Sequence, residues 1–173
     1  FPGMKPFARA LQNRIAALGR AHDFVRPHSE ESAPRNGPAM LKSLLTELLR
    51  PYPALDEERL LIEGEDVEVD DRSATPIGLV FHELATNASK YGALSTPNGI
   101  VGIRCVVAGN VVQLSWEERG GPPVVEPRVL SGFGSRLTEI SIVQQLGGKL
   151  ERQWRPEGLT VRIELPASAL SRS

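Results

Sequence analysis

The sequence predicts an α+β fold: a two-layer sandwich of helices on one face of a mixed, mainly antiparallel sheet, preceded by a separate helix. Two observations predict it. Segments with apolar residues three and four positions apart indicate helices, and pairs of segments with alternating apolar residues indicate hairpins. Helical segments and hairpin segments alternate along the chain, which is the order expected for helices packed on a sheet.

The composition, 40% hydrophobic and 24% charged over 173 residues, is that of an ordinary globular domain that buries a core without disulfides. A net charge of −1 without a basic cluster argues against nucleic acid or a membrane surface as the main partner. No apolar run approaches the roughly 20 residues needed to cross a bilayer. The chain begins at Phe1 without an initiator Met, so we expect a fragment of a longer protein. We expect this fragment to be cytoplasmic, and a membrane anchor elsewhere in the parent protein stays open.

The first helix is expected from about residue 5 to residue 25, because apolar residues there repeat at helical spacing. Its stripe consists of Phe7, Leu11, Ile15, Leu18 and His22. Pro27 discourages continuation, and the polar, Pro-containing stretch that follows is typical of a linker. We therefore divide the chain into a helical element with its linker, 1–37, and a main domain, 38–173.

The main domain is expected to open with a helix over 38–50. Residues 59–69 alternate and predict two short strands around a turn at Gly64. Ser73 is predicted to be the N-cap of a long helix over 74–91.

The rest of the chain predicts two hairpins with a helix between them. In order, the elements are strands 100–107 and 111–116, a helix over 135–146, and strands 149–154 and 159–165. Gly109-Asn110 is a hairpin signal, and Gly147-Gly148 ends the helix. The tail after Pro166 is expected to be frayed.

The helix over 74–91 carries the first chemical surface. Glu83, Asn87 and Lys90 lie on one face, at i, i+4 and i+7. Carboxylate and amide oxygens suit Mg²⁺, and an ammonium suits phosphate, so this face fits a Mg-triphosphate. The alternative is a solvated charged face. His82 borders the apolar stripe and is either structural or close to substrate. That stripe is expected to comprise Ile77, Val80, Phe81, Leu84, Ala88 and Tyr91.

Two glycine-containing segments carry the second candidate chemical surface. Glu118 follows a predicted strand beside Gly120-Gly121, where a carboxylate can accept from an exocyclic amine while glycines let the backbone approach a ring. A strand-ending turn is the alternative. Gly132-Phe133-Gly134-Ser135 opens a helix whose free N–H groups suit phosphate, and an ordinary N-cap at Ser135 is the alternative.

Taken together, these segments resemble the HWE histidine kinase family, which is named for a His in its Asn-containing box and for a Trp-x-Glu motif. The matching segments are 82–95 (HELATNASKYGALS), Trp116-Glu117-Glu118 with Gly120-Gly121-Pro122, 132–137 (GFGSRL) and 154–159 (WRPEGL). The resemblance covers roughly 41–166, and 18–25 more loosely. Three ordered motifs are far more specific than any one of them.

The resemblance implies the ATP-binding sandwich that gyrase-type ATPases and Hsp90 share, with ATP and Mg²⁺ as ligands. It implies that Asn87 binds Mg²⁺, that Glu83 assists the metal, a water or the transfer, and that His82 is a second catalytic candidate. The implied nucleotide-binding set is Asn87, Lys90, Tyr91, Glu118, Gly121, Gly132, Gly134, Ser135 and Arg136, in which Glu118 reads the adenine amine. The segment between Gly121 and Gly132 is the implied lid, and its short length predicts an ordered one.

The activity implied is transfer of the γ-phosphate of ATP to a histidine, followed by relay to the receiver domain of a response regulator. The first helix resembles the second helix of a dimerisation hairpin, so the acceptor is expected before Phe1, within the parent's own upstream sensor and dimerisation domains. Neither His22 nor His28 is expected to accept phosphate. This fragment is therefore expected to bind ATP without autophosphorylating. Alternatives are an ATPase or anti-sigma-type Ser/Thr kinase of the same fold, or a non-catalytic module that docks a regulator.

Overall fold

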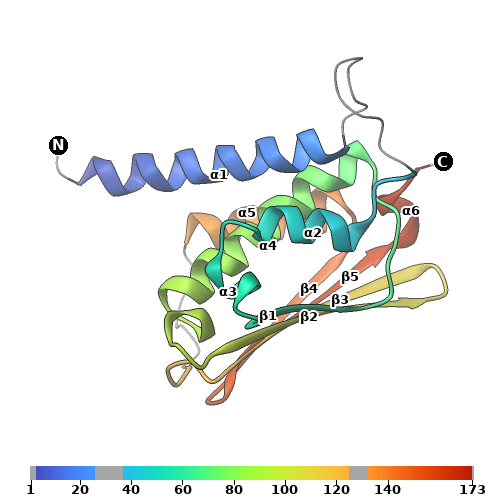
Figure 1. Ribbon diagram of the computed structural model, residues 1–173. Helices are drawn as coiled ribbons and strands as arrows, with labels where there is room; N and C mark the ends of the chain where they lie inside the picture. Colours follow the sequence, from blue (N-terminus) through green and yellow to red (C-terminus); the bar gives the residue numbers. More distant parts are fainter. Residues whose placement is uncertain (1–2, 26–36, 125–131, 173) are drawn as a thin grey trace.

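A computed structural model describes residues 3–25, 37–124 and 132–172, which form helices on one face of a five-stranded sheet (Figure 1). The helices are α1 (Met4–Val25), α2 (Leu41–Leu49), α3 (Pro53–Asp56), α4 (Asp71–Lys90), α5 (Phe133–Glu139) and α6 (Ala167–Leu170), with a 3-10 turn η1 (Ala93–Ser95) and a π-helical segment η2 (Ile140–Gln145). The strands are β1 (Leu60–Gly64), β2 (Ile100–Ala108), β3 (Val111–Arg119), β4 (Lys149–Arg155) and β5 (Gly158–Pro166).

The strand order is β1-β2-β3-β5-β4, with β1 parallel to β2 and every other pair antiparallel. The predicted mixed, mainly antiparallel sheet is therefore confirmed. Both predicted hairpins are present, β2–β3 around Gly109-Asn110 and β4–β5 around Pro156-Glu157. Gly109 has a φ of +62°, the left-handed conformation that a two-residue hairpin turn requires.

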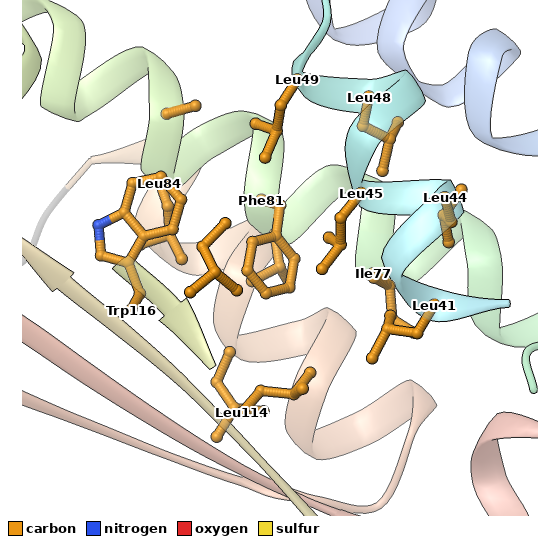
Figure 2. Packing of buried hydrophobic residues seen from close by; sticks show 14 of the residues in the cluster. Leu41, Leu44, Leu45, Leu48, Leu49, Ile77, Phe81, Leu84, Leu114 and Trp116 are labelled. Atoms are coloured by element: carbon orange, nitrogen blue, oxygen red, sulfur yellow. The ribbon is translucent and has the colours of Figure 1, made fainter. Parts of the chain in front are cut away.

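The core lies between the sheet and helices α2 and α4 (Figure 2). Trp116 of β3 is completely buried, and its ring centroid lies 6.1 Å from that of Phe81 on α4. The leucines of α2 cover the other side of Phe81 in Figure 2. This packing matters for function because it holds α4 and β3, the two elements that carry the predicted acidic site residues, in one fixed relation.

Residues 59–69 form the first of the two predicted short strands, but not the second. β1 pairs in parallel with β2, and beyond Gly64 the chain turns away so that Glu68 forms an isolated bridge with Met40. Gly64 has a φ of +90°, and a Cβ there would lie 2.2 Å from the carbonyl oxygen of Cys105. The turn at Gly64 was predicted correctly, but the second strand was wrong: residues 65–69 make an isolated bridge and no strand, because alternation does not reveal whether a segment finds a partner.

The cap of α4 is Asp70 and not Ser73. Asp70 Oδ1 accepts hydrogen bonds from the N–H groups of Arg72 (3.0 Å) and Ser73 (2.9 Å). The Asp70 N–H donates in turn to Ser73 Oγ at 3.2 Å, which completes a capping box. The helix consequently begins three residues earlier than predicted.

The tail after Pro166 is ordered, so the prediction of a frayed end was wrong. Leu170 of α6 is buried, and its carbonyl accepts from the Asp70 N–H and from Ser73 Oγ. The Arg172 N–H donates to Asp70 Oδ2. These bonds tie the end of the chain to the start of α4.

Helix α1 lies across α4 and projects beyond the rest of the molecule at its N-terminal end (Figure 1). Ala17 and Ala21 are buried, and a Cβ on Gly78 of α4 would lie 2.8 Å from the Ala21 Cβ. Phe7, Leu11 and Ile15 of the predicted stripe are exposed, as is His22. His28 falls outside the described residues. Within the described ranges, no helix has both the length and the apolar character to span a bilayer.

Candidate functional site

Glu83 lies on α4 near the centre of the helical layer and is only 4% exposed. Arg14 of α1 donates two hydrogen bonds to the Glu83 carboxylate, from Nε to Oε1 at 2.5 Å and from Nη2 to Oε2 at 3.2 Å. A Cβ on Gly134 would lie 2.1 Å from Glu83 Oε2, so any larger residue there would force the Glu83 carboxylate to move. The alternative of a solvated face is therefore wrong for Glu83, because α1 and α5 cover it.

Phe133, the first residue of α5, lies beside this pair. Its ring centroid is 5.2 Å from the Arg14 guanidinium carbon, a cation–π distance. Gly132 is the N-cap of α5, so the predicted Ser135 cap is wrong; Ser135 is half-buried and Arg136 exposed in the first turn. The helix predicted over 135–146 thus begins at Phe133 and ends as the π-helical segment η2.

His82 is buried behind the Glu83 face. Its Nδ1 lies 3.4 Å from the Tyr52 hydroxyl, which also lies 3.0 Å from Thr86 Oγ1. Burial lowers the pKa of His82, although the nearby Glu83 carboxylate acts in the opposite direction. A neutral, packed imidazole beside Tyr52 matches the structural alternative for His82.

Asn87 and Lys90 are exposed on the C-terminal half of α4, one and nearly two turns beyond Glu83. Tyr91 is 74% exposed, so its predicted place in the apolar stripe is wrong. The reason is that α4 ends at Lys90, and Tyr91 is the C-cap, where the helical period no longer applies. The other predicted stripe residues are buried: Ile77, Val80, Phe81, Leu84 and Ala88.

Glu118 forms a second buried acidic position, 5% exposed. It lies two residues from Trp116 on the same face of β3, and the Trp116 Nε1–H donates to Glu118 Oε2 at 3.0 Å. The Ala93 N–H donates to Oε1, also at 3.0 Å. Burial raises the pKa of Glu118, while these two hydrogen bonds act against the rise. β3 runs through Arg119, so Glu118 lies within the strand and not in the turn after it.

Glycines close the backbone around Glu118. A Cβ on Gly92 would lie 2.0 Å from Glu118 Oε1, and one on Gly158 would lie 1.7 Å from the Glu118 carbonyl oxygen. A Cβ on Gly121 would lie 2.7 Å from the Ala93 Cα. These approaches explain glycine at all three positions. Residues 125–131 of the predicted lid lie outside the described ranges.

The fold thus brings the predicted site residues to two places joined by α4: Glu83 with Gly134, and Glu118 with Gly121. Asn87 and Lys90 lie on the helix between them. The sequence reasoning missed Arg14, because nothing in α1 marks one of its arginines as a partner for a residue 69 positions away. It also missed the hydrogen bond inside the Trp-x-Glu motif, although the i, i+2 spacing on a predicted strand offered that signal.

Comparisons with known proteins show which proteins this chain resembles in sequence and in fold. No family model matches the chain. The Blue-light-activated histidine kinase 1 of Erythrobacter litoralis is 36% identical over 165 residues, which make up 92% of this chain and 44% of that protein. The histidine kinase domain of the blue-light-activated histidine kinase EL346, from the same species, superposes with a TM-score of 0.65, covering 91% of this chain and 75% of that one at 22% identity. The histidine kinase ThkA, in its complex with the response regulator TrrA, superposes with a TM-score of 0.57 over 96% of this chain and 52% of that one, at 18% identity.

The five-stranded sheet with α2, α4 and α5 on one face is the fold of a histidine kinase catalytic domain. The chain is similar to named histidine kinases along most of its length, and the resemblance to the HWE group inferred from its motifs is confirmed. It spans somewhat less than half the length of two curated relatives that it matches, 44% and 45%.

Proposed function

We propose that this chain binds Mg-ATP and acts as the catalytic part of a histidine kinase, supplying the γ-phosphate to a histidine. One observation carries the proposal: Glu83 lies on α4 against Gly134, and Gly92 and Ala93, just after the C-terminal end of α4, contact the buried, hydrogen-bonded Glu118 of β3. The helix rises about 1.5 Å per residue, so Glu83 and the last helical residue, Lys90, are roughly 10 Å apart along the axis. An extended nucleoside triphosphate fits such a separation.

Glu118 is the base-reading residue in this proposal. Its two oxygens are held by Trp116 and Ala93, and each oxygen retains a further lone pair for an exocyclic amine. Adenine offers that amine, whereas guanine presents a carbonyl oxygen in the same place. The ionised carboxylate therefore favours adenine over guanine.

The metal is proposed to bind at Asn87, assisted by Glu83. Among the described residues, no group of three or more His, Cys, Asp or Glu side chains is arranged to hold a metal ion. An amide oxygen and one carboxylate fit a cation that arrives with the triphosphate, because Mg²⁺ keeps phosphate oxygens and waters among its ligands. When bound, Mg²⁺ neutralises charge on the transferring phosphoryl group. Lys90 supplies a further positive charge to the phosphates, and Tyr91 lies next to it.

The remaining assignments concern the parent protein. We propose that residues 1–37 belong to its dimerisation and phosphotransfer unit and 38–173 to its catalytic domain. ThkA has been crystallised with a response regulator, which supports a receiver domain as the downstream partner. Gly132, Gly134, Ser135 and Arg136 are proposed to wrap the phosphates, and Gly121 to approach the base.

The test is calorimetric titration of the chain with Mg-ADP. Wild type is expected to bind. Asn87→Ala is expected to bind about tenfold or more weakly, because it removes an oxygen that contacts a charged ligand. Ser89→Ala, an exposed change two residues further along α4 on a different face of the helix, is the matched control. No binding by wild type contradicts the nucleotide assignment and favours a docking module, and equal binding by Asn87→Ala contradicts the metal assignment.

The acceptor requires the intact parent. A phosphoprotein formed on histidine is lost in acid, whereas one formed on serine or threonine survives. Acid-stable product would identify a Ser/Thr kinase, and phosphate release without any phosphoprotein would identify an ATPase.

A further inference from the structure

Helix α1 reaches the proposed catalytic carboxylate through one side chain, Arg14. We propose that Arg14 is a latch: while α1 is seated on α4, Arg14 withholds Glu83 from Mg-nucleotide, and movement of the N-terminal half of α1 releases it. The inference rests on the proposed function, because it assigns a competitor to the residue that assists the metal or the transfer.

The first step is the geometry of the ion pair. Arg14 donates to both oxygens of Glu83, and the side chains are only 18% and 6% exposed. A two-pronged guanidinium–carboxylate contact is the strongest and most directional form of this pair. A carboxylate held in this way has much of its charge offset and its orientation fixed, so it is a weaker ligand for a metal ion or a water than a free carboxylate.

The second step is that the latch touches the glycine segment proposed for the phosphates. The Arg14 guanidinium lies over the Phe133 ring at 5.2 Å. Gly134 packs against Glu83, and a Cβ there would also approach Arg14 Nη2 at 3.3 Å. Elements α1, α4 and α5 therefore meet at a single contact, and a phosphate chain settling on Gly132–Gly134 must displace or rearrange it.

The third step is that this contact can open without unfolding the domain. On the N-terminal side of Arg14, α1 is exposed except for half-buried Ala10. The burial of α1 lies on the other side, at Ala17 and Ala21 and at half-buried Phe24 and Val25, which pack against the core. Arg14 is thus the outermost strong anchor of a helix that projects beyond the body (Figure 1).

The contact between α1 and α4 has a second feature that favours separation of the two helices. Arg20, two turns further along α1, has a buried Nε for which the described part of the chain provides no hydrogen-bond partner. A buried donor without a partner disfavours the seated arrangement. A helix contact with one strong ion pair and one unsatisfied N–H donor is suited to separate when that pair is lost.

Since the latch and the nucleotide use the same carboxylate, their effects are reciprocal. Mg-nucleotide binding must loosen α1, and loss of the latch must strengthen Mg-nucleotide binding by the same factor. A movement imposed on α1 from its N-terminal side would in this way control access to Glu83.

The experiment uses the whole chain with Arg14→Ala, Arg14→Lys and, as a matched control, Arg9→Ala at an exposed position of the same helix. Two quantities are measured: affinity for Mg-ADP by calorimetry and hydrogen exchange of α1 amides. Arg14→Ala is expected to bind Mg-ADP at least about fivefold more tightly. Arg14→Lys is expected to be intermediate because an ammonium lacks the planar fork, and Arg9→Ala is expected to match wild type.

Exchange in the N-terminal half of α1 is expected to be faster in Arg14→Ala without nucleotide, and in wild type once Mg-ADP is added. Unchanged or weaker affinity in a folded Arg14→Ala overturns the latch while leaving the nucleotide assignment intact. Tighter binding without faster α1 exchange also overturns it, because the effect is then local charge and not release of the helix. If no variant binds Mg-ADP, the proposed function fails and the latch fails with it. Should Arg14→Ala not fold, Arg14→Lys decides: a gain in affinity supports the latch and no gain overturns it.

Discussion

Trp116 does two things with one side chain. Its ring fills the core against Phe81, and its N–H holds the Glu118 carboxylate. Because residues two apart on a strand face the same way, the Trp-x-Glu spacing is what puts the donor beside the acceptor. The motif is therefore a positioning device within one strand.

Trp116→Phe keeps an aromatic ring and removes the donor. We expect its affinity for Mg-ADP to fall about fivefold, the effect of one hydrogen bond of about 1 kcal/mol, and its preference for ADP over GDP to shrink. Calorimetric titration with both nucleotides measures this, and Trp154→Phe on β4, which lies away from Glu118 in sequence and strand, is the control. An equal loss for ADP and GDP would point to general damage to the core instead.

Helix α4 is the element on which both acidic positions depend, and its start is set by Asp70. The Asp70 carboxylate caps the helix with Oδ1 and holds the Arg172 N–H with Oδ2. Burial alone raises the pKa of Asp70, but hydrogen bonds from Ser73 and Arg172 outweigh it and hold the pKa below its ordinary value. The ionised form is thus favoured in the folded state.

Asp70→Ala is expected to lower the free energy of unfolding by about 1 kcal/mol, the usual contribution of such a cap. Because the folded-state pKa is the lower one, this stabilisation is present above about pH 4 and is lost as the pH falls through the folded-state pKa. Urea unfolding at neutral and acid pH measures the difference from wild type, which should shrink in acid. Asp71→Ala, an exposed change at the next position, should cost less. A difference that grows in acid would contradict the assignment.

At the scale of the whole molecule, the end of the chain closes the helical layer. Leu170 is 1% exposed and joins the core beside the start of α4 and strand β5. Helix α6 thus connects the start of α4 to the end of the chain, although the two lie about a hundred residues apart in sequence.

Leu170→Ala should accordingly lower the free energy of unfolding by about 2–4 kcal/mol, since it leaves a cavity in the core. Ser168→Ala on the exposed side of α6 should have little effect. Chemical denaturation of both variants checks this. A negligible loss for Leu170→Ala would restore the frayed tail predicted from the sequence.

The sequence by itself determined the local elements and the chemistry available on them. Periodicity located the longer helices and both hairpins, because these depend on neighbours a few residues apart, but it did not locate the short helices α3 and α6. The glycines and the acidic residues of the site were also identifiable, because the motifs keep them at short, ordered spacings. The start of α4 was misplaced by three residues because both Asp70 and Ser73 are good capping residues, and only the hydrogen bonds distinguish them.

The tertiary structure alone decided which distant segments meet. It paired β1 with β2, brought the Ala93 N–H to Glu118, and placed Arg14 on Glu83 across 69 positions. Alternation and helical spacing describe one segment at a time, so they carry no information about the partner across a core. That is why the acidic residues of the site were predicted from the sequence, and the arginine that holds one of them was not.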